Sequence, residues 1–527
     1  MDRYDVIVVG AGSSGGVIAA RLAENPDRRV LLLEAGPDFP NEEAVPPLFT
    51  VSGEHSWRVA GIPEFDWDLV NSDGAGALRG RSIRLPRGRL VGGTSMINAT
   101  IAARGAPFDF DRWAAMGCVG WAWTDVASLF NAIETDLDFG DQPNHGDAGP
   151  IFIQRYKAGS WAPVNRVMYE ACLELGVREA ADLNAADAQA GVIGAIPHNR
   201  YKEVRLGTLV TYLRAARRRP NLTMRADRLV DRVLLSGAKA TGVSYLGRDR
   251  RVETAYADEI VLSAGVYNSP AILQRSGIGP AEWLRELGIA IAADLPVGRN
   301  LLDHPGFGMR FRAEGLGGQT GRLFAANVRG PANADGEPEW QTHPFPIDEE
   351  ENIAGFWTYL TRQEAEGSVR IEDADPLRPP LIDHRYNTRT RDRDRFARAR
   401  AFFQEMLAAP AFQRLGATWL DDISMPISDA LAEGMGAAHH QAGTARMGPA
   451  RDSRAVVGPD LRVHGFDNLR VADTSIYPDN VMHNTNLTAL VVGEVAARLI
   501  GGRNSTIGSL DSVGIAPPAI DPPESLA

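Results

Sequence analysis

The chain has 527 residues, 44% of them hydrophobic, and it is longer than a single hydrophobic core usually accommodates, so we expect two domains. Its net charge of −12 argues against nucleic acid as a partner, because phosphate binding requires a clustered basic surface. The two cysteines, Cys118 and Cys172, exclude a disulfide framework and argue against a zinc cluster.

The N-terminal segment lacks the pattern of a targeting signal. Acidic residues flank its short apolar run, whereas a signal peptide begins with basic residues and ends at a cleavage site of small residues. No apolar segment of the sequence reaches the roughly 18–20 residues that span a bilayer. We therefore expect a soluble, cytoplasmic protein with no membrane partner.

The first 36 residues indicate one βαβ unit. An apolar strand over 6–9 leads into the loop Gly10-x-Gly12-x-x-Gly15, and a helix-forming stretch and a second apolar strand follow. Such a loop allows a tight turn and close backbone approach to a pyrophosphate. Glu34 ends the second strand, where a carboxylate accepts hydrogen bonds from ribose hydroxyls. The residues expected at a dinucleotide here are Gly10, Gly12, Ser13, Ser14, Gly15, Glu34 and Ala35.

The same loop also contains the pattern of a hydrolase nucleophile elbow, Gly12-x-Ser14-x-Gly16. An elbow also occupies a strand-to-helix turn, so the local context fits both interpretations. Position favours the dinucleotide, because an elbow normally follows several strands and Ser14 follows the first. A hydrolase would also leave Glu34 without a role.

Beyond this unit, the Gly-, Pro- and Arg-rich segment 37–110 predicts extended loops. A helix is expected to begin at Ser269 with Pro270 in its first turn, where the missing N–H costs nothing. Between about 311 and 435 the alternation of strands and helices weakens, which indicates a second domain. After Leu469 a short strand and an apolar helix return to the first pattern, so the first domain is discontinuous. Further strands are expected over 221–235, 242–245, 259–263 and 368–371.

Two further motifs, 88–98 and 264–279, resemble the signatures of the glucose–methanol–choline (GMC) oxidoreductases. The stretches 439–448 and 473–478 resemble the same family, and the motifs together cover nearly the whole chain in family order. The resemblance implies an enzyme that uses FAD to oxidise an alcohol. The flavin supplies the redox chemistry, and the protein positions and polarises it.

The resemblance implies an α/β fold with a discontinuous, Rossmann-like FAD-binding domain. A smaller α+β substrate-binding domain with an antiparallel sheet is expected beside it. The expected ranges are 1–155, 195–310 and 450–502 for the FAD-binding domain, 156–194 and 311–449 for the substrate-binding domain, and 503–527 for a loose tail.

The physical properties of the motifs fit the resemblance. Gly92 and Gly93 carry no side chains, so their loop can press backbone N–H groups against a flavin or a diphosphate. Some family members attach the flavin to a histidine two residues after the Gly-Gly-x-Ser stretch. Ile97 occupies that position here, so we expect non-covalent FAD. Further FAD contacts implied by the resemblance are Gly92, Gly93, Thr94, Ser95, Asn98, Val230 (through its backbone), Ala264, Gly265 and Asp473.

Hydride removal from a carbinol carbon is easier as the hydroxyl proton leaves, so the reaction needs a base, and histidine has a suitable pKa. Of the ten histidines, His440 aligns with the catalytic base of the family, and the ring of His439 is expected to point away. The second catalytic position of the family is a His or an Asn. It falls on Asn484, whose amide would hold the substrate oxygen, with His483 as the alternative.

Other side chains are weaker candidates. Trp357 is either an aromatic wall of the substrate site or part of the core, and Ala438, two residues before His440, is a candidate near the flavin carbon that meets oxygen. The substrate-side set is therefore Trp357, Ala438 and His439. Histidines elsewhere are expected in polar loops without metal-ligand spacing, so we expect no metal; they are His55, His145, His343 and His384.

The family pattern looks most like bacterial oxidases of aromatic and furanic primary alcohols. We expect oxidation of such an alcohol to the aldehyde, with oxygen as acceptor and hydrogen peroxide as product, by a monomer or a homodimer. The alternatives are a dehydrogenase that uses a quinone or carrier protein, a non-redox family member such as a hydroxynitrile lyase or a photodecarboxylase, and a flavoprotein without activity.

Overall fold

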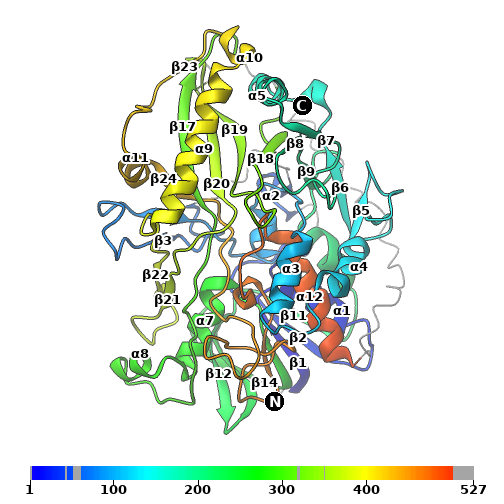
Figure 1. The fold of residues 1–527 in the computed structure, drawn as a ribbon. Helices are drawn as coiled ribbons and strands as arrows, with labels where there is room; N and C mark the ends of the chain where they lie inside the picture. Colours follow the sequence, from blue (N-terminus) through cyan, green and yellow to red (C-terminus); the bar gives the residue numbers. More distant parts are fainter. Residues whose placement is uncertain (1–2, 42–43, 51–60, 317–320, 349–350, 503–527) are drawn as a thin grey trace.

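The computed structural model describes residues 3–41, 44–50, 61–316, 321–348 and 351–502, and it has a mixed α/β fold (Figure 1). The expected loose tail over 503–527 and the expected loop around His55 lie outside these residues. Among the described helices, none combines the length and the apolar character that crossing a bilayer would require.

The N-terminal strand lies within a seven-stranded sheet of the order β11, β2, β1, β14, β13, β12, with β25 also paired to β14. β1 pairs in parallel with β2 and β14, whereas β12, β13 and β14 are antiparallel. Strands from both ends of the described chain therefore share one sheet. Their bounds are β1 (Arg3–Val9), β2 (Val30–Leu33), β11 (Leu222–Arg225), β12 (Leu229–Ser236), β13 (Lys239–Leu246), β14 (Val252–Leu262) and β25 (Leu469–Val471).

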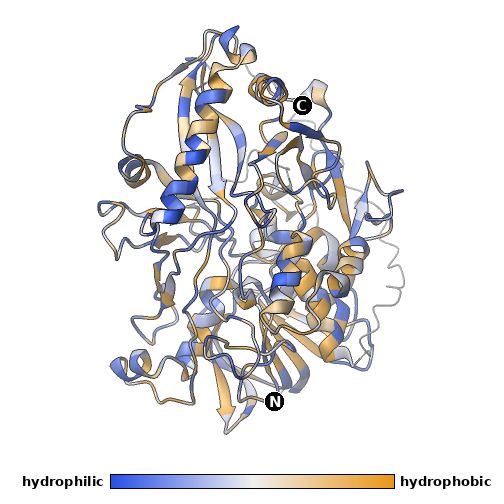
Figure 2. Cartoon of the chain, viewed as in Figure 1, coloured by the Kyte–Doolittle hydropathy of each residue, from blue (hydrophilic) through white to orange (hydrophobic). Residues whose placement is uncertain are grey.

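The central strands of this sheet are apolar because helices cover them. All of β2 is buried, as is usual for a parallel strand with both faces covered. Helices α1 (Ser13–Leu22) and α12 (Asn486–Gly501) pack together, and α12 is mostly hydrophobic (Figure 2). A Cβ at Gly493 of α12 would lie 2.8 Å from the Ser14 carbonyl oxygen of α1, so only glycine allows this close approach.

A second sheet has eight strands in the order β23, β17, β20, β19, β18, β8, β7, with β24 also paired to β17. All its pairs are antiparallel except β7 with β8. The strands are β7 (Arg178–Ala180), β8 (Val192–Ala195), β17 (Pro305–Arg312), β18 (Ala326–Arg329), β19 (Trp340–Asp348), β20 (Ile353–Leu360), β23 (Thr418–Trp419) and β24 (Met435–Ala437).

The two faces of this second sheet have different roles. Helix α9 (Thr390–Ala408) lies along one face (Figure 1), where Phe356 of β20 packs on Phe403 with ring centroids 5.2 Å apart. Successive side chains of a strand point to opposite faces. Trp357 and Tyr359 of β20 accordingly line a cavity on the other side.

Shorter elements connect the two sheets. The described residues of the segment 37–110 are mostly loop, as expected, but they include α2, β3, β4 and the beginning of α3. The remaining strands are β3 (Leu69–Asn71), β4 (Ile83–Leu85), β5 (Glu134–Asp136), β6 (Ile151–Arg155), β9 (Pro197–Tyr201), β10 (Val204–Arg205), β15 (Ile278–Gly279), β16 (Ala293–Asp294), β21 (Ser368–Arg370) and β22 (Leu381–Asp383). The remaining α-helices are α2 (Pro47–Thr50), α3 (Pro107–Ala115), α4 (Trp123–Ile133), α5 (Pro163–Glu174), α6 (Arg214–Ala216), α7 (Gly265–Arg275), α8 (Ala281–Glu286), α10 (Pro410–Gln413) and α11 (Ile427–Gly434).

Two expectations about elements are wrong. The segment 221–235 forms two strands, because the chain turns at Asp227, which has a φ of 54°, and β11 and β12 then pair with different neighbours. Helix α7 begins at Gly265, so Pro270 lies inside it and leaves the carbonyl of Val266 without its helical partner. The hydroxyl of Thr444 donates to this carbonyl at 2.6 Å, which compensates for the proline.

Candidate active site

A cavity of about 730 Å³ extends from the loop after β1 to the outer face of β19 and β20. We call its two parts the glycine half and the aromatic half. The glycine half is lined by parts of 9–14, 33–35, 93–99 and 263–268. The aromatic half is lined by Phe324, His343, Phe345, Trp357, Tyr359, 436–441 and Asn484.

Backbone atoms form much of the glycine half. A Cβ at Gly10 would lie 2.4 Å from the Ser263 carbonyl oxygen, and one at Gly93 would lie 2.8 Å from Gly12 Cα, so side chains are excluded at both positions. Gly12 is the N-cap of α1 and provides no side-chain cap. The first N–H groups of α1 are therefore available to an anion.

Glu34 is buried at the end of β2 and lines the same half. Its carboxylate accepts hydrogen bonds from the backbone N–H groups of Ala11 and Gly36, both at 2.9 Å. Burial raises the pKa of Glu34 to about 7, although these two hydrogen bonds oppose the shift. The side chain thus also holds the glycine loop against the strand, a role that the sequence pattern did not predict.

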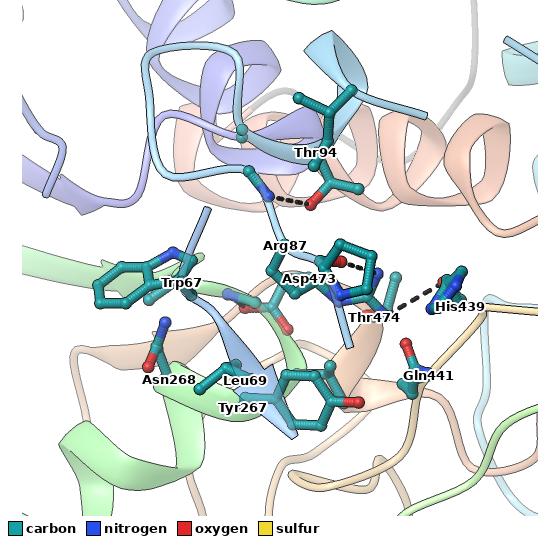
Figure 3. Close-up of a pocket in the computed structure, with 18 of the residues that line it drawn as sticks. Trp67, Leu69, Arg87, Thr94, Tyr267, Asn268, His439, Gln441, Asp473 and Thr474 are labelled. Carbon is teal, nitrogen blue, oxygen red and sulfur yellow. Dashed lines mark hydrogen bonds between the residues drawn. The ribbon is translucent and has the colours of Figure 1, made fainter. Parts of the chain in front are cut away.

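The other expected FAD contacts divide into two groups. Most line the cavity, and Figure 3 shows Thr94 and Asp473 at its wall. Three lie behind the wall: Gly15 packs α1 onto the glycine loop, Gly92 has a φ of 97°, and Ser95 donates to the Gly92 carbonyl at 2.6 Å. The contacts that line the cavity are Gly10, Gly12, Ser13, Ser14, Glu34, Ala35, Gly93, Thr94, Asn98, Val230, Ala264, Gly265 and Asp473.

His440 and Asn484 lie together at the junction of the two halves. The amide nitrogen of Asn484 lies 2.9 Å from His440 Nε2. An amide NH₂ group can only donate, so Nε2 of His440 accepts and carries the lone pair. Both residues line the cavity, which gives a bound molecule access to this nitrogen.

The opposite nitrogen of the His440 ring contacts a second histidine that the sequence analysis missed. His440 Nδ1 lies 2.9 Å from Nδ1 of His304, so one of the two nitrogens donates to the other. Nε2 of His440 accepts from the Asn484 amide, so the proton of a neutral His440 ring lies on Nδ1. His440 therefore donates from Nδ1 to Nδ1 of His304, and its Nε2 stays free of a proton.

Asp303 fixes the backbone of the same segment. It is fully buried, and its carboxylate accepts from the backbone N–H of His440 at 2.8 Å and from the Gln441 side chain at 2.7 Å. The hydroxyl of Tyr386 also donates to it. A polar Asp-His pair between buried leucines and the proline that begins β17 was the sequence signal for this arrangement.

The histidine cluster is neutral. Burial lowers the pKa of His440 well below its usual value, and neighbouring His304, His439 and Arg87 lower it further. Burial likewise lowers the pKa of His304 to about 3. A neutral imidazole with a free Nε2 is the form that can accept a proton.

His439 and His483 are the sequence neighbours of His440 and Asn484, and they lie in different environments. His439 has a φ of 65°, is exposed and lines the cavity near Arg87 (Figure 3), in contrast to the buried His440. Its carbonyl accepts from Arg87 at 3.1 Å. His483 is buried between Gln341 and Gln189, with its ring nitrogens 2.5 and 3.0 Å from their side chains.

Trp357 dominates the wall of the aromatic half. Its indole lies over three glycines of β17 and β24, where an added Cβ would come within 2.4 Å (Gly306), 3.2 Å (Gly308) and 2.7 Å (Gly436) of the ring. Trp357 therefore fits both expected roles: its indole packs on the sheet, and the residue also lines the cavity. Ala438 also lines it, and its N–H donates to the His304 carbonyl at 3.0 Å.

His145 and His384 lie in loops, as expected, whereas the expectation of a loop is wrong for His343; all three residues are buried. His343 belongs to β19, and His384 Nδ1 lies 2.8 Å from the side-chain oxygen of Asn71. Side chains from distant segments enclose these rings, which a local sequence pattern does not reveal.

His145 lies far from the pair in sequence and within a cluster of charges. Glu134, Asp136 and His145 have ligand-type atoms within 4.8 Å of one another, the spacing of a metal site. Two guanidinium groups already neutralise the carboxylates, since Arg104 pairs with Glu134 at 2.5 Å and Arg155 with Asp136 at 3.0 Å. These contacts indicate an ion-pair network.

The chain is similar to known proteins over nearly its full length. Family models described as GMC oxidoreductase match residues 4–306 and 363–493. The 5-(hydroxymethyl)furfural oxidase of Methylovorus sp. (strain MP688) is 35% identical, over 94% of this chain and 98% of the relative. An oxygen-dependent choline dehydrogenase of Escherichia coli O17:K52:H18 (strain UMN026 / ExPEC) is 33% identical, over 95% and 96%. The crystal structure of pyridoxine 4-oxidase from Mesorbium loti has a TM-score of 0.86 and 30% identity, over 95% of this chain and 100% of that one.

Proposed function

The chain belongs to the GMC oxidoreductase family, and we propose that it uses FAD to oxidise a small primary alcohol with an aromatic or heteroaromatic ring to the aldehyde. Molecular oxygen then reoxidises the flavin and yields hydrogen peroxide. The observation that carries the proposal is the His440–Asn484 pair, which faces the aromatic half of the cavity that begins at the glycine loop.

The glycine half fits FAD. Cβ atoms at Gly10 and Gly93 would fill it, and the uncapped start of α1 offers N–H groups to a diphosphate. Glu34 would bind a ribose, and the backbone of Val230 would bind the adenine. Ile97 lines the cavity with a hydrocarbon side chain, which supports non-covalent binding.

The two large sheets support the proposed domains. β1, β14 and β25 share one sheet, and β7, β8 and β17 share the other. We assign 1–155, 195–310 and 450–502 to an FAD-binding domain, and 156–194 and 311–449 to a substrate-binding domain. Because β17 (Pro305–Arg312) pairs within the second sheet, the boundary near 310 moves to just before Pro305.

In the proposed reaction, His440 acts as the base. Its Nε2 accepts the hydroxyl proton of the alcohol while its Nδ1–H continues to donate to His304. The Asn484 amide, at 2.9 Å from Nε2, would donate to the substrate oxygen as negative charge develops there. Bound FAD supplies the acceptor for the hydride. With the loss of one proton and one hydride the alcohol becomes the aldehyde.

The aromatic half of the cavity supports the proposed substrate class and the proposed acceptor, oxygen. Phe324, Phe345, Trp357 and Tyr359 provide ring surfaces on which an aromatic alcohol could stack. The small side chain of Ala438, next to the base in the cavity, leaves room for oxygen. The relatives named above as oxidases or as oxygen-dependent support oxygen as the acceptor.

The experiment that tests this function is anaerobic reduction of the bound flavin by a panel of benzylic, furanic, pyridine, sugar and aliphatic alcohols, followed by admission of air. We expect rapid bleaching of the visible flavin band by ring-bearing primary alcohols, then fast recovery with release of peroxide. Slow recovery would replace the oxidase by a dehydrogenase. A well-bound flavin that no alcohol bleaches would overturn the proposal and favour a non-redox member of the family.

A further inference from the structure

His343 is a polar side chain in the aromatic half of the cavity. It is only 7% exposed, and it lines the cavity from β19. Within the described part of the chain, Nδ1 of His343 is buried without a hydrogen-bond partner, and Nε2 is not buried and has no partner either. Nε2 is therefore the ring nitrogen that a molecule in the cavity can reach, and pairing there would satisfy a polar atom that is otherwise unpaired.

The surroundings of His343 place it beyond the ring-binding surface. His343 pairs in register with Trp357 across β19 and β20, so the two side chains are neighbours on the same face of the sheet. Tyr359 contacts both histidines, with its ring centroid 6.2 Å from that of His343 and 5.6 Å from that of His440. A substrate whose carbinol group lies at His440 therefore extends its ring past Tyr359 toward His343.

The chemistry of His343 defines what it can bind. Burial lowers the pKa of His343 to about 4, so the ring is neutral and offers one N–H donor and one acceptor nitrogen. The neighbouring Phe324 ring, 5.1 Å away, adds no polar group. The hydroxyl of Tyr359 is already directed at Gln341, at 3.4 Å. Among the described residues of this wall, His343 is thus a polar group without a hydrogen-bond partner. Gln441 Oε1 is another, but the amide of Gln441 is held by Asp303.

We propose that His343 is a specificity residue that hydrogen-bonds a second polar group, such as a hydroxyl or a carbonyl, on the ring of the substrate, away from the carbinol that is oxidised. The inference rests on the proposed alcohol oxidation and narrows its substrate to aromatic alcohols with two polar ends. Sites built to bind a polar group discriminate strongly against analogues that lack it, because their own polar atoms stay unpaired.

The test compares two probes of similar size, 1,4-benzenedimethanol and 4-ethylbenzyl alcohol, by kcat/KM. The value for the diol is first halved for its two equivalent carbinols. We expect the wild-type enzyme to prefer the diol by about tenfold, the effect of one buried hydrogen bond. In His343→Phe, which keeps an aromatic ring beside Phe324 and Tyr359, the ratio should fall to about one through loss of activity on the diol alone.

His343→Gln serves as the matched variant, because its amide retains a donor and an acceptor, and it should keep a preference for the diol. The flavin absorption spectrum of each variant reports whether the site is intact. Equal kcat/KM for both probes in the wild type would overturn the role of His343 while leaving the oxidation itself in place. An equal loss on both probes in His343→Phe would overturn it as well. Failure of both probes to reduce wild-type flavin would contradict the proposed function instead.

Discussion

Two buried histidines of this molecule, His440 and His145, have opposite charge states. His440 contacts the neutral ring of His304 and the amide of Asn484, each at 2.9 Å. Burial and its neighbours lower the pKa of His440 well below the usual value. His145 is enclosed by carboxylates of Glu134, Asp136 and Asp182 at 2.8, 3.2 and 2.9 Å.

At His145 the hydrogen bonds to carboxylates together have a larger effect on the pKa than burial has. Burial acts to lower its pKa, but hydrogen bonds to Asp136, Asp182 and Glu134 outweigh burial and raise the pKa to about 10. Burial alone therefore does not determine the charge of a histidine, because the groups that contact the ring do. The comparison supports the role proposed for His440, a base that is ready to accept a proton, and a stabilising role for His145 as a fixed cation.

The largest expected effect is on the catalytic side. His440→Ala should lower kcat by about 10²–10⁴-fold, the usual contribution of a general base, while FAD binding is retained. Turnover with a ring-bearing alcohol and the absorption spectrum of the bound flavin measure the two quantities. Near wild-type turnover in a flavin-loaded variant would remove His440 from the mechanism.

His145→Phe should destabilise the protein by about 3–5 kcal/mol, because it removes one of the three cations, His145, Arg104 and Arg155, that compensate the buried carboxylates. Urea unfolding of the flavin-loaded protein measures this loss. Turnover per folded molecule should not change, since His145 does not line the cavity. His145→Gln is the matched control, because it keeps hydrogen-bonding capacity without the charge. An unaltered unfolding midpoint in both variants would contradict the charged state.

Because His145 is charged, its contribution to stability should depend on pH. The folded-state pKa of about 10 lies above the usual histidine value of about 6.5, so the contribution to stability is complete below about pH 6.5. It is lost as the pH rises through about 10. The stability difference between the wild type and His145→Gln should therefore shrink over this range, and a difference independent of pH would count against it.

A smaller effect is expected at the residue that orients the base. His304→Phe removes the acceptor for His440 Nδ1–H, so the proton can occupy either ring nitrogen, and kcat should fall by about 10–10²-fold from the loss of orientation. His304→Asn should restore much of kcat, because its side-chain oxygen can accept the same N–H. Stopped-flow flavin reduction separates this effect from binding. Equal losses in Phe and Asn variants would indicate a purely structural role.

How far the sequence predicts these two regions depends on the range of the contacts. The βαβ unit, its glycine loop and Glu34 form local patterns, and His440 and Asn484 align with positions of the family. All of these could therefore be predicted from the sequence. His304 and His440 are 136 residues apart, and no periodicity connects them. The same limit explains why the burial of His145, which does lie in a loop, was not predicted. Its partners come from several segments, and polar residues in irregular sequence usually indicate solvent.

Helix α7 shows a second case in which a contact between distant residues overrides a local sequence pattern. Pro270 predicts a helix start, because proline has no N–H to donate within a helix. The structure places it inside the helix, since the hydroxyl of Thr444, far along the chain, donates to the carbonyl that proline leaves free. The preference of proline for a helix start is a local property, whereas the Thr444 hydroxyl that overrides it comes from a distant part of the chain.

The smallest expected effect distinguishes two adjacent residues near the base. His483 is buried and bonded to Gln341 and Gln189, and it does not line the cavity, whereas Asn484 does. His483→Gln should change kcat/KM by less than about tenfold, the effect of one buried hydrogen bond, whereas Asn484→Ala should lower kcat by about 10²–10³-fold. Steady-state kinetics on the same alcohol decide between them. The reverse order of effects would make His483, in place of Asn484, the catalytic partner of His440.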